Sequence, residues 1–246
     1  MLIGILSDIH ANREALDAVL ERLRGIAVDR LVLLGDIVGY GPDPAYAVDT
    51  ALRLVGEGAV CLLGNHDEAA VGAAAGMNEN ARAAILWTQR QLSDGHTAFL
   101  RGLPLTHREG DFLFTHASAA QPATWPYVQD AADAALCLQA TDVQTVVCGH
   151  THVPAIYYAR PGSPVTSFTP LSNKSAPLFA TRRHVVVAGS VGQPRDGNPA
   201  ACIALLDTGG MTATMLRVPY DWDATAQKIA AAGLPTWLGM RLRIGR

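Results

Sequence analysis

The chain has 246 residues, of which 49% are hydrophobic and 17% charged, and its formal net charge is −3. This length and composition suit one globular domain over residues 1–246, without a low-complexity tract. No block of basic residues and no alternation of aromatic and basic residues is present, so the usual footprint of a nucleic-acid-binding protein is missing. No apolar run reaches the length that spans a bilayer, which argues against a membrane protein.

The amino-terminal residues and the cysteines bear on the cellular compartment. Residues 1–6 are predicted to form a strand, because no basic leader and no cleavage site of small residues precedes the first polar motif. The cysteines lie far apart in apolar runs and form no CxxC pair, which is typical of reduced core residues. We therefore expect a cytoplasmic protein with four reduced cysteines. These are Cys61, Cys137, Cys148 and Cys202.

Hydrophobic periodicity in the first half of the chain alternates between strand and helix. Apolar runs predict the strands, and leucines at helical spacing, such as Leu16, Leu20 and Leu23, predict the helices. Asn12 is expected to cap the first of these helices. In chain order the predicted elements are strand 2–6, helix 13–23, strand 31–34, helix 44–54, strand 60–63, and helices 78–92 and 94–100.

Strands become frequent in the second half. Segments 106–108 and 112–115 are predicted to pair as a hairpin around Glu109 and Gly110. Residues 160–176 are rich in Pro, Ser and Thr and are predicted to form a surface loop. The apolar tail is expected to dock as a helix on the domain rather than to form an oligomer contact. The remaining predicted elements are helix 131–139, strands 143–148, 155–158, 184–188, 200–206 and 211–218, and helices 224–232 and 236–243.

Five short polar motifs each follow directly after an apolar run that predicts a strand. Because residues beyond the carboxyl ends of strands meet at one edge of an α/β sheet, we expect the motif side chains to converge there. Any one motif occurs by chance in many chains, whereas all five in this order would rarely coincide. The motifs are Ser7-Asp8-Ile9-His10, Gly35-Asp36, Gly64-Asn65-His66-Asp67, Thr115-His116 and Gly149-His150-Thr151-His152.

These motifs offer carboxylate, imidazole and amide ligands and no thiolate. Asp8 and His10 stand two residues apart, so both can point to the same side of an extended segment. His150 and His152 repeat this spacing, and Asp36 supplies a carboxylate that can bridge two cations. Such a mixed set of oxygen and nitrogen ligands suits Mn²⁺, Fe or Zn²⁺ better than Ca²⁺. The sequence therefore predicts a dinuclear metal site.

His116 competes with His107 for one of the imidazole positions. His107 precedes the predicted hairpin turn, whereas His116 stands at a strand end, like the other motif residues. We therefore expect His116 to be the ligand, and we expect His96, His107 and His184 to be surface or packing residues.

The five motifs closely resemble those of the calcineurin-like metallophosphoesterases, and within them the small bacterial phosphodiesterase branch. The resemblance implies an α/β fold, a four-layer α/β/β/α sandwich in which two packed β-sheets are flanked by helices. It also implies an enzyme that hydrolyses phosphate esters with two divalent ions, with Mn²⁺ favoured over Fe, Zn²⁺, Ni²⁺ or Mg²⁺. It covers nearly the whole chain and includes Gly39-Tyr40-Gly41-Pro42 and Gly189-Ser190-Val191-Gly192-Gln193-Pro194-Arg195-Asp196-Gly197.

The same resemblance implies a role for each motif residue. Asp36 lies between the two metals, His66 is the acid near the leaving group, and Asp67 is an orienting partner beside it. The ligands of one metal are Asp8, His10 and His152, and those of the other are Asn65, His116 and His150.

The physical chemistry of phosphate hydrolysis agrees with this assignment. Two cations about 3.5 to 4 Å apart lower the pKa of a shared water and clamp the phosphate oxygens, so that a bridging hydroxide can attack phosphorus. Protonated His66 on the far side could then donate to the leaving oxygen, and Asp67 is expected to raise the pKa of that imidazole. Arg195 is expected to bind the substrate phosphate and Tyr40 to line the rim, with a solvated arginine and a packing tyrosine as the alternatives.

The substrate stays open between several classes. Phosphodiesters or monoesters, including nucleotides and dinucleoside polyphosphates, account for every motif. A phosphoprotein phosphatase and a non-enzymatic interaction scaffold are the alternatives, and the complete ligand set argues against the scaffold. Specificity is expected to reside in loops such as 160–176, and assembly into a homo-oligomer stays open.

Overall fold

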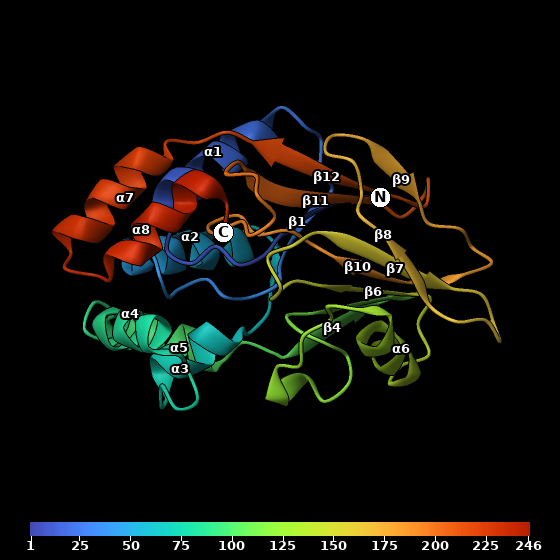
Figure 1. The fold of residues 1–246 in the computed structure, drawn as a ribbon, viewed down its shortest axis with the longest axis horizontal. Coiled ribbons are helices and arrows are strands. Elements are labelled where there is room, and N and C mark those ends of the chain that lie inside the picture. The colour runs from blue at the N-terminus through green and yellow to red at the C-terminus, as the bar shows by residue number, and fades with distance from the viewer.

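The computed structural model describes all residues from 1 to 246, and its elements form two six-stranded sheets with helices outside them (Figure 1). The sheets face each other across a shared apolar core, and helices cover both outer faces. The four-layer α/β/β/α sandwich predicted from the sequence is therefore confirmed. No helix combines the length and the apolar character that crossing a bilayer requires.

The first sheet consists of β1 (Leu2–Leu6), β2 (Arg30–Leu33), β3 (Val60–Cys61), β9 (Ser175–Pro177), β11 (Ala201–Asp207) and β12 (Thr212–Val218). Its strand order is β3-β2-β1-β11-β12-β9. Strands β1, β2 and β3 pair in parallel, whereas β11, β12 and β9 pair antiparallel to their neighbours. The polar motifs after β1, β2 and β3 therefore meet at one sheet edge.

The second sheet consists of β4 (Thr106–Glu109), β5 (Phe112–Thr115), β6 (Thr145–Cys148), β7 (Ala155–Ala159), β8 (Thr166–Phe168) and β10 (Arg183–Val187). Its strand order is β4-β5-β6-β10-β7-β8. Strands β5, β6 and β10 are parallel, and β4 pairs with β5 as the predicted hairpin. The motifs after β5 and β6 therefore also share one edge.

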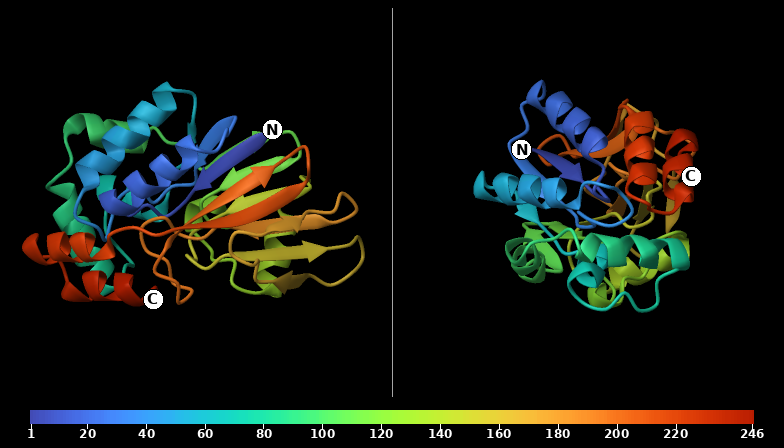
Figure 2. Two further views of the ribbon diagram at one scale, coloured as in Figure 1. Left: turned by 90° about the horizontal axis from the view of Figure 1, so that it is seen from above. Right: turned by 90° about the vertical axis from the view of Figure 1, so that its left-hand side faces the viewer.

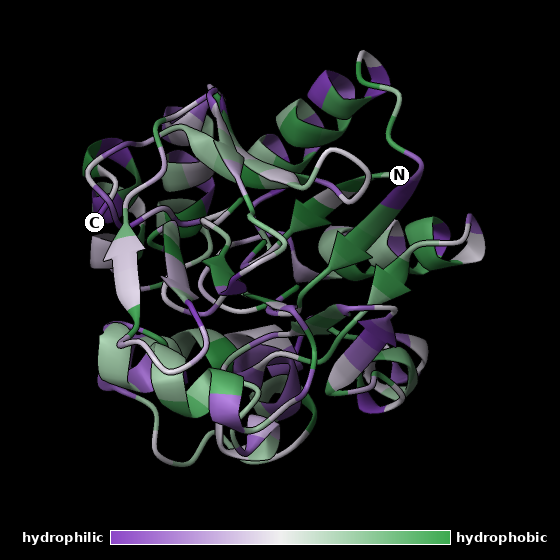
Figure 3. Cartoon of the chain, turned by 90° about the vertical axis from the view of Figure 1, so that its right-hand side faces the viewer, coloured by the Kyte–Doolittle hydropathy of each residue, from purple (hydrophilic) through white to green (hydrophobic).

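The alternation of residues along the strands explains the layering. Ile3 and Ile5 of β1 face the second sheet and pack with Phe114 and Val186, whereas Leu6 belongs to the cluster under the outer helices. Strand β1, in the middle of its sheet, thus buries both faces. Figure 3 shows the hydrophobic residues concentrated in the central strands, with hydrophilic colour mainly on the elements around them.

Helices α1 (Arg13–Arg24) and α2 (Pro44–Gly56) cover the first sheet, and α6 (Ala131–Gln139) covers the second. Helices α3 (Asn65–Val71), α4 (Glu79–Gln89) and α5 (Asp94–Arg101) pack together. Helices α7 (Trp222–Ala231) and α8 (Thr236–Ile244) pack on each other, and α7 also packs on α1. Figures 1 and 2 show α3 to α5 and α7 to α8 at the same end of the molecule, away from the N-terminus.

One prediction about local structure was wrong, and one helix was missed. Residues 160–176 are not a plain surface loop, because they contain β8 and the start of β9. All three residues of β8 are exposed, so this edge strand lacks the alternation by which strands are recognised. Helix α3 was not predicted, because its seven residues begin within the Gly64-Asn65-His66-Asp67 motif and show no helical period of apolar residues.

Several other predictions are confirmed. The side chain of Asn12 caps α1 by accepting from the backbone N–H of Ala15 at 3.1 Å. Leu238 and Leu242 of the tail are buried, so α8 docks on the domain as expected. The four cysteines are all buried and unpaired.

Candidate metal centre

The side chains of the five motifs converge where the strands of both sheets end. Three groups of three side chains can be distinguished, and within each group the imidazole nitrogen and carboxylate oxygen atoms lie within 4.8 Å of one another. Because the groups share members, they form one continuous centre. Six of the seven predicted ligands are buried, and Asn65 is half-buried. The three groups are Asp8, His10 and His152; His10, Asp36 and His66; and Asp36, His116 and His150.

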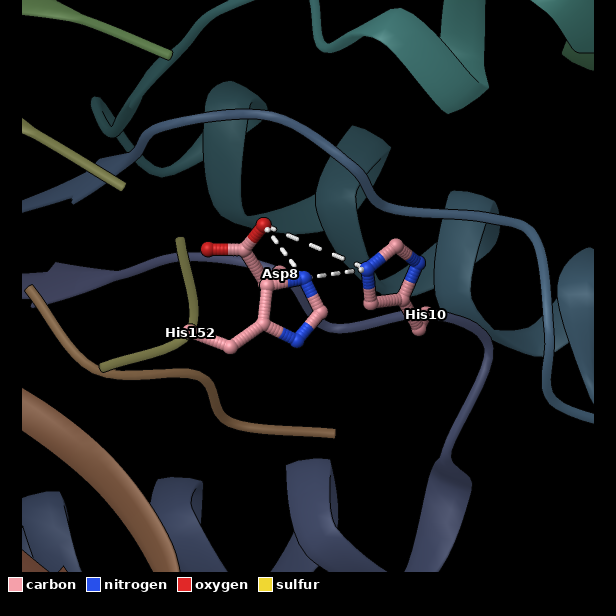
Figure 4. A group of neighbouring side chains, drawn as sticks. All are labelled: Asp8, His10 and His152. Atoms are coloured by element: carbon pink, nitrogen blue, oxygen red, sulfur yellow. Dashed lines mark hydrogen bonds and ion pairs between the residues drawn. The ribbon is translucent and has the colours of Figure 1, made fainter. Parts of the chain in front are cut away.

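The first group joins Asp8 and His10 to His152, which lies 142 residues after His10 in the chain (Figure 4). The Nε2 atoms of His10 and His152 lie 3.2 Å apart, and Asp8 Oδ1 lies 3.2 Å from the Nε2 atom of His152. Asp8 Oδ1 is buried without a hydrogen-bond donor, whereas Asp8 Oδ2 accepts from Ser7 Oγ at 2.6 Å. An orphaned carboxylate oxygen that faces two imidazole nitrogens is the arrangement that a cation would complete.

The second group is built around His116. Its Nε2 atom lies 3.1 Å from Asn65 Oδ1 and 3.2 Å from His150 Nδ1. Asp36 Oδ2 lies 3.5 Å from the Nε2 atoms of both His10 and His116. Asp36 therefore stands between the two groups, and its Oδ1 atom is held by the backbone N–H of His66 at 2.8 Å.

Backbone carbonyls set the protonation of three of the imidazoles. In each ring Nδ1 faces a carbonyl oxygen, which requires a hydrogen on Nδ1 and leaves the lone pair of Nε2 pointing into the centre. Metal-ligating histidines commonly have such a second partner, so the donor set fits divalent ions. The pairs are His10 with Val38 O at 3.1 Å, His116 with Leu34 O at 3.0 Å, and His152 with Gln193 O at 2.6 Å.

The backbone of the centre is strained. Five of the predicted ligands have a left-handed backbone conformation, with φ between 50° and 67°, which residues other than glycine rarely adopt. The surrounding hydrogen bonds and packing must hold them there, and this directs adjacent side chains of each motif into one small volume. The five are Asp8, His10, Asp36, His150 and His152.

Glycine is required where the loops of the centre touch. A Cβ atom on Gly64 would lie 2.2 Å from the backbone nitrogen of Asp36, and one on Gly192 would lie 1.8 Å from the carbonyl oxygen of Ile9. Gly192 therefore allows the loop before Arg195 to lie directly on the first motif.

Burial and nearby charges shift the pKa values of the carboxyl groups in the centre. Burial raises the pKa of Asp8, but the nearby His152, His116 and His10 outweigh it and hold the pKa well below its ordinary value. Burial, Asp67 and Asp8 together raise the pKa of Asp36 well above its ordinary value. A bound cation would reverse the shift of Asp36, because it favours the charged form of a carboxylate that contacts it.

Burial also lowers the pKa of the imidazoles. The pKa of His150 is lowered to about 3, by burial first and then by His116. The pKa values of His10, His116 and His152 are likewise lowered, with burial as the largest cause. The rings are therefore neutral at pH 7, which is the form that binds a metal.

His66 lies beside the first group, but Asp67 does not orient it. The two carboxylate oxygens of Asp67 accept from the backbone N–H groups of Val38 and Gly64, each at 3.1 Å, so this side chain ties two loops together. The expectation that Asp67 raises the pKa of His66 is corrected accordingly. Burial, followed by His152 and other neighbours, lowers the pKa of His66 well below its ordinary value, and its Nδ1 atom has no hydrogen-bond partner.

Tyr40 and Arg195 both lie at the centre. The ring centroid of Tyr40 is 4.6 Å from that of His10 and 4.4 Å from that of His66, and Tyr40 is buried. The guanidinium of Arg195 lies over the Tyr40 ring at 5.7 Å and donates to Gln193 Oε1. Arg195 has no carboxylate partner, so its positive charge is available to an anion at this edge.

Two aromatic residues at the centre were not predicted from the sequence. Tyr127 stacks on His150 with ring centroids 4.0 Å apart, and Trp125 meets His116 edge-on at 5.7 Å. Trp125 also donates its indole N–H to Glu68 at 2.8 Å. The only signal for them was the Trp-Pro-Tyr run soon after the Thr115-His116 motif.

Fold and centre together define a dinuclear-type metallophosphoesterase, and the sequence profile agrees. The profile of the Calcineurin-like phosphoesterase superfamily domain matches residues 1–211, and the chain belongs to this family. It is accordingly a metal-dependent enzyme that hydrolyses phosphate esters. Helices α7 and α8 lie beyond the matched residues.

Two relatives resemble the chain over its full length, and a third resembles about half of it. A metallophosphoesterase from Sphaerobacter thermophilus is 38% identical with a TM-score of 0.88, and the match covers 100% of this chain and 99% of that one. An uncharacterized protein of Methanocaldococcus jannaschii is 32% identical over 100% of this chain and 98% of its own length. A symmetrical bis(5'-nucleosyl)-tetraphosphatase of Methylococcus capsulatus is 31% identical, but over only 51% of this chain and 45% of its own length.

Proposed function

We propose that the centre holds two divalent ions and hydrolyses a phosphate bond of a nucleotide-type substrate. The observation that carries the proposal is the position of Asp36, whose Oδ2 atom lies 3.5 Å from Nε2 of both His10 and His116. One carboxylate oxygen equidistant from two ligand groups is the geometry of a bridging ligand. Asp8, His10 and His152 would hold one ion, and Asn65, His116 and His150 the other.

The ions would supply the nucleophile and neutralise the phosphate charge. The residues of the chain then have three tasks. The carbonyl-bound imidazoles keep their Nε2 lone pairs aimed at the centre, which reduces the reorganisation that binding requires. Arg195 lies where it can donate to phosphate oxygens, since no carboxylate occupies its guanidinium.

His66 is proposed to donate a proton to the leaving oxygen. Its ring lies 4.8 Å from that of His10 and contacts Tyr40, and its Nδ1 atom has no protein partner. The lowered pKa of His66 leaves the ring neutral in the chain alone. A bound phosphate dianion would raise that pKa, since an opposite charge favours the protonated form.

Manganese is the proposed metal, as the family resemblance implies, and Fe, Zn²⁺, Ni²⁺ or Mg²⁺ are alternatives that the same carboxylate, imidazole and amide ligands would accept. We propose the cytoplasm as the compartment, since the four buried unpaired cysteines suit reducing conditions. Nucleotides are proposed as substrates because relatives with partial coverage are named tetraphosphatases of dinucleosides. Phosphoprotein hydrolysis is the weaker alternative, since the likeness to a cold-active protein-tyrosine phosphatase of Shewanella, at 16% identity, shows the fold alone.

Metal content and a substrate panel test the proposal. Protein as purified, protein treated with chelator, and protein reloaded with Mn²⁺ should be assayed on bis-p-nitrophenyl phosphate, a nucleotide, a dinucleoside polyphosphate and a phosphopeptide. We expect two ions per chain, loss of activity with the chelator and recovery with metal. Full activity with one ion or none would overturn the dinuclear site, and His107→Ala, which removes a histidine outside the centre, is the matched control.

A further inference from the structure

Helix α8 lines one side of a cavity that lies beside the metal centre. The cavity has a volume of about 320 Å³ and shares Tyr40 with the centre. Leu238 and Leu242 of α8 pack in one apolar cluster with Tyr40, so the helix is directly attached to the ring that contacts His10 and His66. The cavity lining is Tyr40, Asn78, Glu79, Asn80, Trp237, Leu238 and Arg241.

Arg241 brings a second guanidinium to this wall. Its Nε atom donates to the backbone carbonyl of Arg246, and its terminal amino groups donate to no protein acceptor. No Asp or Glu side chain pairs with Arg241 or with Arg195; Arg241 donates to an oxygen of Arg246, and Arg195 donates to Gln193 Oε1. Arg195 thus lies over the Tyr40 ring, Arg241 lines the cavity beside the same residue, and the terminal amino groups of Arg241 have no protein acceptor.

A backbone hydrogen bond joins the two segments that carry these arginines. The backbone N–H of Gly197, just after Arg195, donates at 2.9 Å to the carbonyl of Gly245, just after α8. Burial, and then repulsion by Arg195, lowers the pKa of Arg241 to about 10. Two like charges held near each other with no acidic side chain paired to either cost free energy that an anion between them would recover.

We propose that Arg195 and Arg241 form an anion subsite beside the metal centre, which binds the phosphate next to the one that is attacked. The preferred substrates would then be nucleoside polyphosphates, in preference to simple diesters. This inference rests on the proposed function of the metal centre. Trp237, which is 45% exposed, offers an aromatic face to the nucleobase, and Asn80 and Glu79 offer acceptors to its amino group or to the ribose.

The subsite would also change what the leaving group needs. Hydrolysis of a phosphoanhydride forms a P–O bond to water and breaks the bridging P–O bond, whose electron pair stays on the departing phosphate. The proton lost by water passes to solvent or to the product. A departing phosphate needs charge neutralisation more than a proton, and two guanidiniums provide it by charge-assisted hydrogen bonds.

Glu79 is the one acidic group in the cavity wall, and it faces a substrate that carries several negative charges. It belongs to the first turn of α4, opposite α8. The anion is therefore expected at the Arg195 side of Tyr40, with the uncharged nucleoside toward Glu79 and Trp237. This polarity gives the substrate one orientation.

The experiment compares two substrates on Mn²⁺-loaded full-length protein, diadenosine tetraphosphate and bis-p-nitrophenyl phosphate. Arg241→Gln should lower the ratio of their kcat/KM values by about 10- to 100-fold, mainly through KM for the tetraphosphate, because a charge-assisted pair is lost. Arg241→Lys, which keeps the charge but not the planar fork, should give an intermediate ratio and carries the test if the Gln variant does not fold. Arg243→Gln, two residues further along α8 and directed at Trp222, is the matched control.

A binding measurement separates this inference from the proposed function. Titration calorimetry with adenosine 5'-(α,β-methylene)diphosphate on chelator-treated protein should show binding that Arg241→Gln weakens and Arg243→Gln does not. An unchanged substrate ratio with unchanged binding would overturn the subsite while the metal-dependent activity stands. If wild type hydrolyses no ester with any metal but the binding difference is found, the proposed function fails and the subsite stands.

Discussion

The Nε2 atoms of His10 and His152 face each other at 3.2 Å, and the Nδ1 atom of each ring is held by a backbone carbonyl. Because Nδ1 carries the hydrogen in both rings, two lone pairs point at each other across the buried centre. Asp8 Oδ1 adds a negative charge to the same space. This arrangement is unfavourable without a cation, so metal binding and folding are coupled at this point.

Metal loading should therefore stabilise the fold. At a free Mn²⁺ concentration about 100 times the dissociation constant, the free energy of unfolding should rise by about 2.7 kcal/mol. Calorimetric melting with chelator and with Mn²⁺ checks this. The matched variant His152→Ala should melt at a temperature that responds less to Mn²⁺, and an equal response in both proteins would contradict the role of this pair.

Asp36→Asn should weaken both metal sites together, because its Oδ2 atom stands at equal distance from the two ligand groups. We expect the occupancy of both metal sites to fall and activity to drop by about 100-fold or more. An amide carries no negative charge, so it binds two cations less well than a carboxylate does. His152→Ala should lower mainly one occupancy. Elemental analysis of both variants, made in parallel, decides the matter, and loss of a single ion from Asp36→Asn would argue against a shared carboxylate.

His66→Ala should keep both ions and lose activity in proportion to the need of the leaving group for a proton. The loss should be about 10² to 10⁴ for alkyl or nucleoside esters and small for p-nitrophenyl esters, because an acidic phenol leaves as its anion. A series of aryl esters of graded leaving-group pKa measures this. Equal Brønsted slopes in wild type and variant would exclude the acid role, and a lost ion would indicate that His66 is a ligand, as its grouping with His10 and Asp36 allows.

Asn12→Ala should destabilise the fold by about 2 kcal/mol, since one side chain caps a helix and also bonds a second loop. Its Oδ1 atom accepts from the N–H of Ala15, and its Nδ2 atom donates to Gly192 O at 2.8 Å. Asn12→Ser keeps a capping oxygen without adding a charge but loses the bond to Gly192. Urea unfolding should rank wild type above Asn12→Ser and Asn12→Ser above Asn12→Ala; equal loss in both variants would mean that the cap contributes little.

His184 should make the fold less stable in acid. Burial, and then Arg182, lowers its pKa from 6.5 to about 4, so the folded state favours the neutral ring. Its contribution to stability is complete above pH 6.5 and is lost as pH falls from there toward 4, because the unfolded chain takes up the proton first. Because His184 is buried, the loss between pH 7 and pH 5 should be about 1 to 2 kcal/mol.

The control for this effect is His184→Phe, which keeps a planar ring that does not titrate. Urea unfolding of both proteins at pH 7 and pH 5 in chelator should show the smaller decrease for the variant. No residue of the metal centre contributes to the pKa shift of His184, so metal occupancy does not affect the difference between the two proteins. The same decrease in both proteins would show that other groups cause the acid sensitivity.

The sequence by itself determined the layers of the fold and the chemistry of the centre. Continuous apolar runs predict most of the strands, because a strand that is covered on both faces is apolar at nearly every position. The motifs at the strand ends also predict the ligand types, since polar side chains that directly follow buried strands meet at one edge of the sheet. His116 was separated from His107 in this way, and it is His116 that lies 3.5 Å from Asp36.

Only the tertiary structure decided how the polar groups are used. Asp67 stands beside His66 in the chain, yet its carboxylate holds the backbone of Val38 and Gly64, because a buried charge goes to the unsatisfied N–H groups nearest in space. The left-handed backbone of residues such as Asp8 depends on loops that meet from distant segments, which no local pattern records. Arg241 reaches the edge of the centre for the same reason: packing of α8 on Tyr40, about two hundred residues away in the chain, is a property of the folded molecule alone.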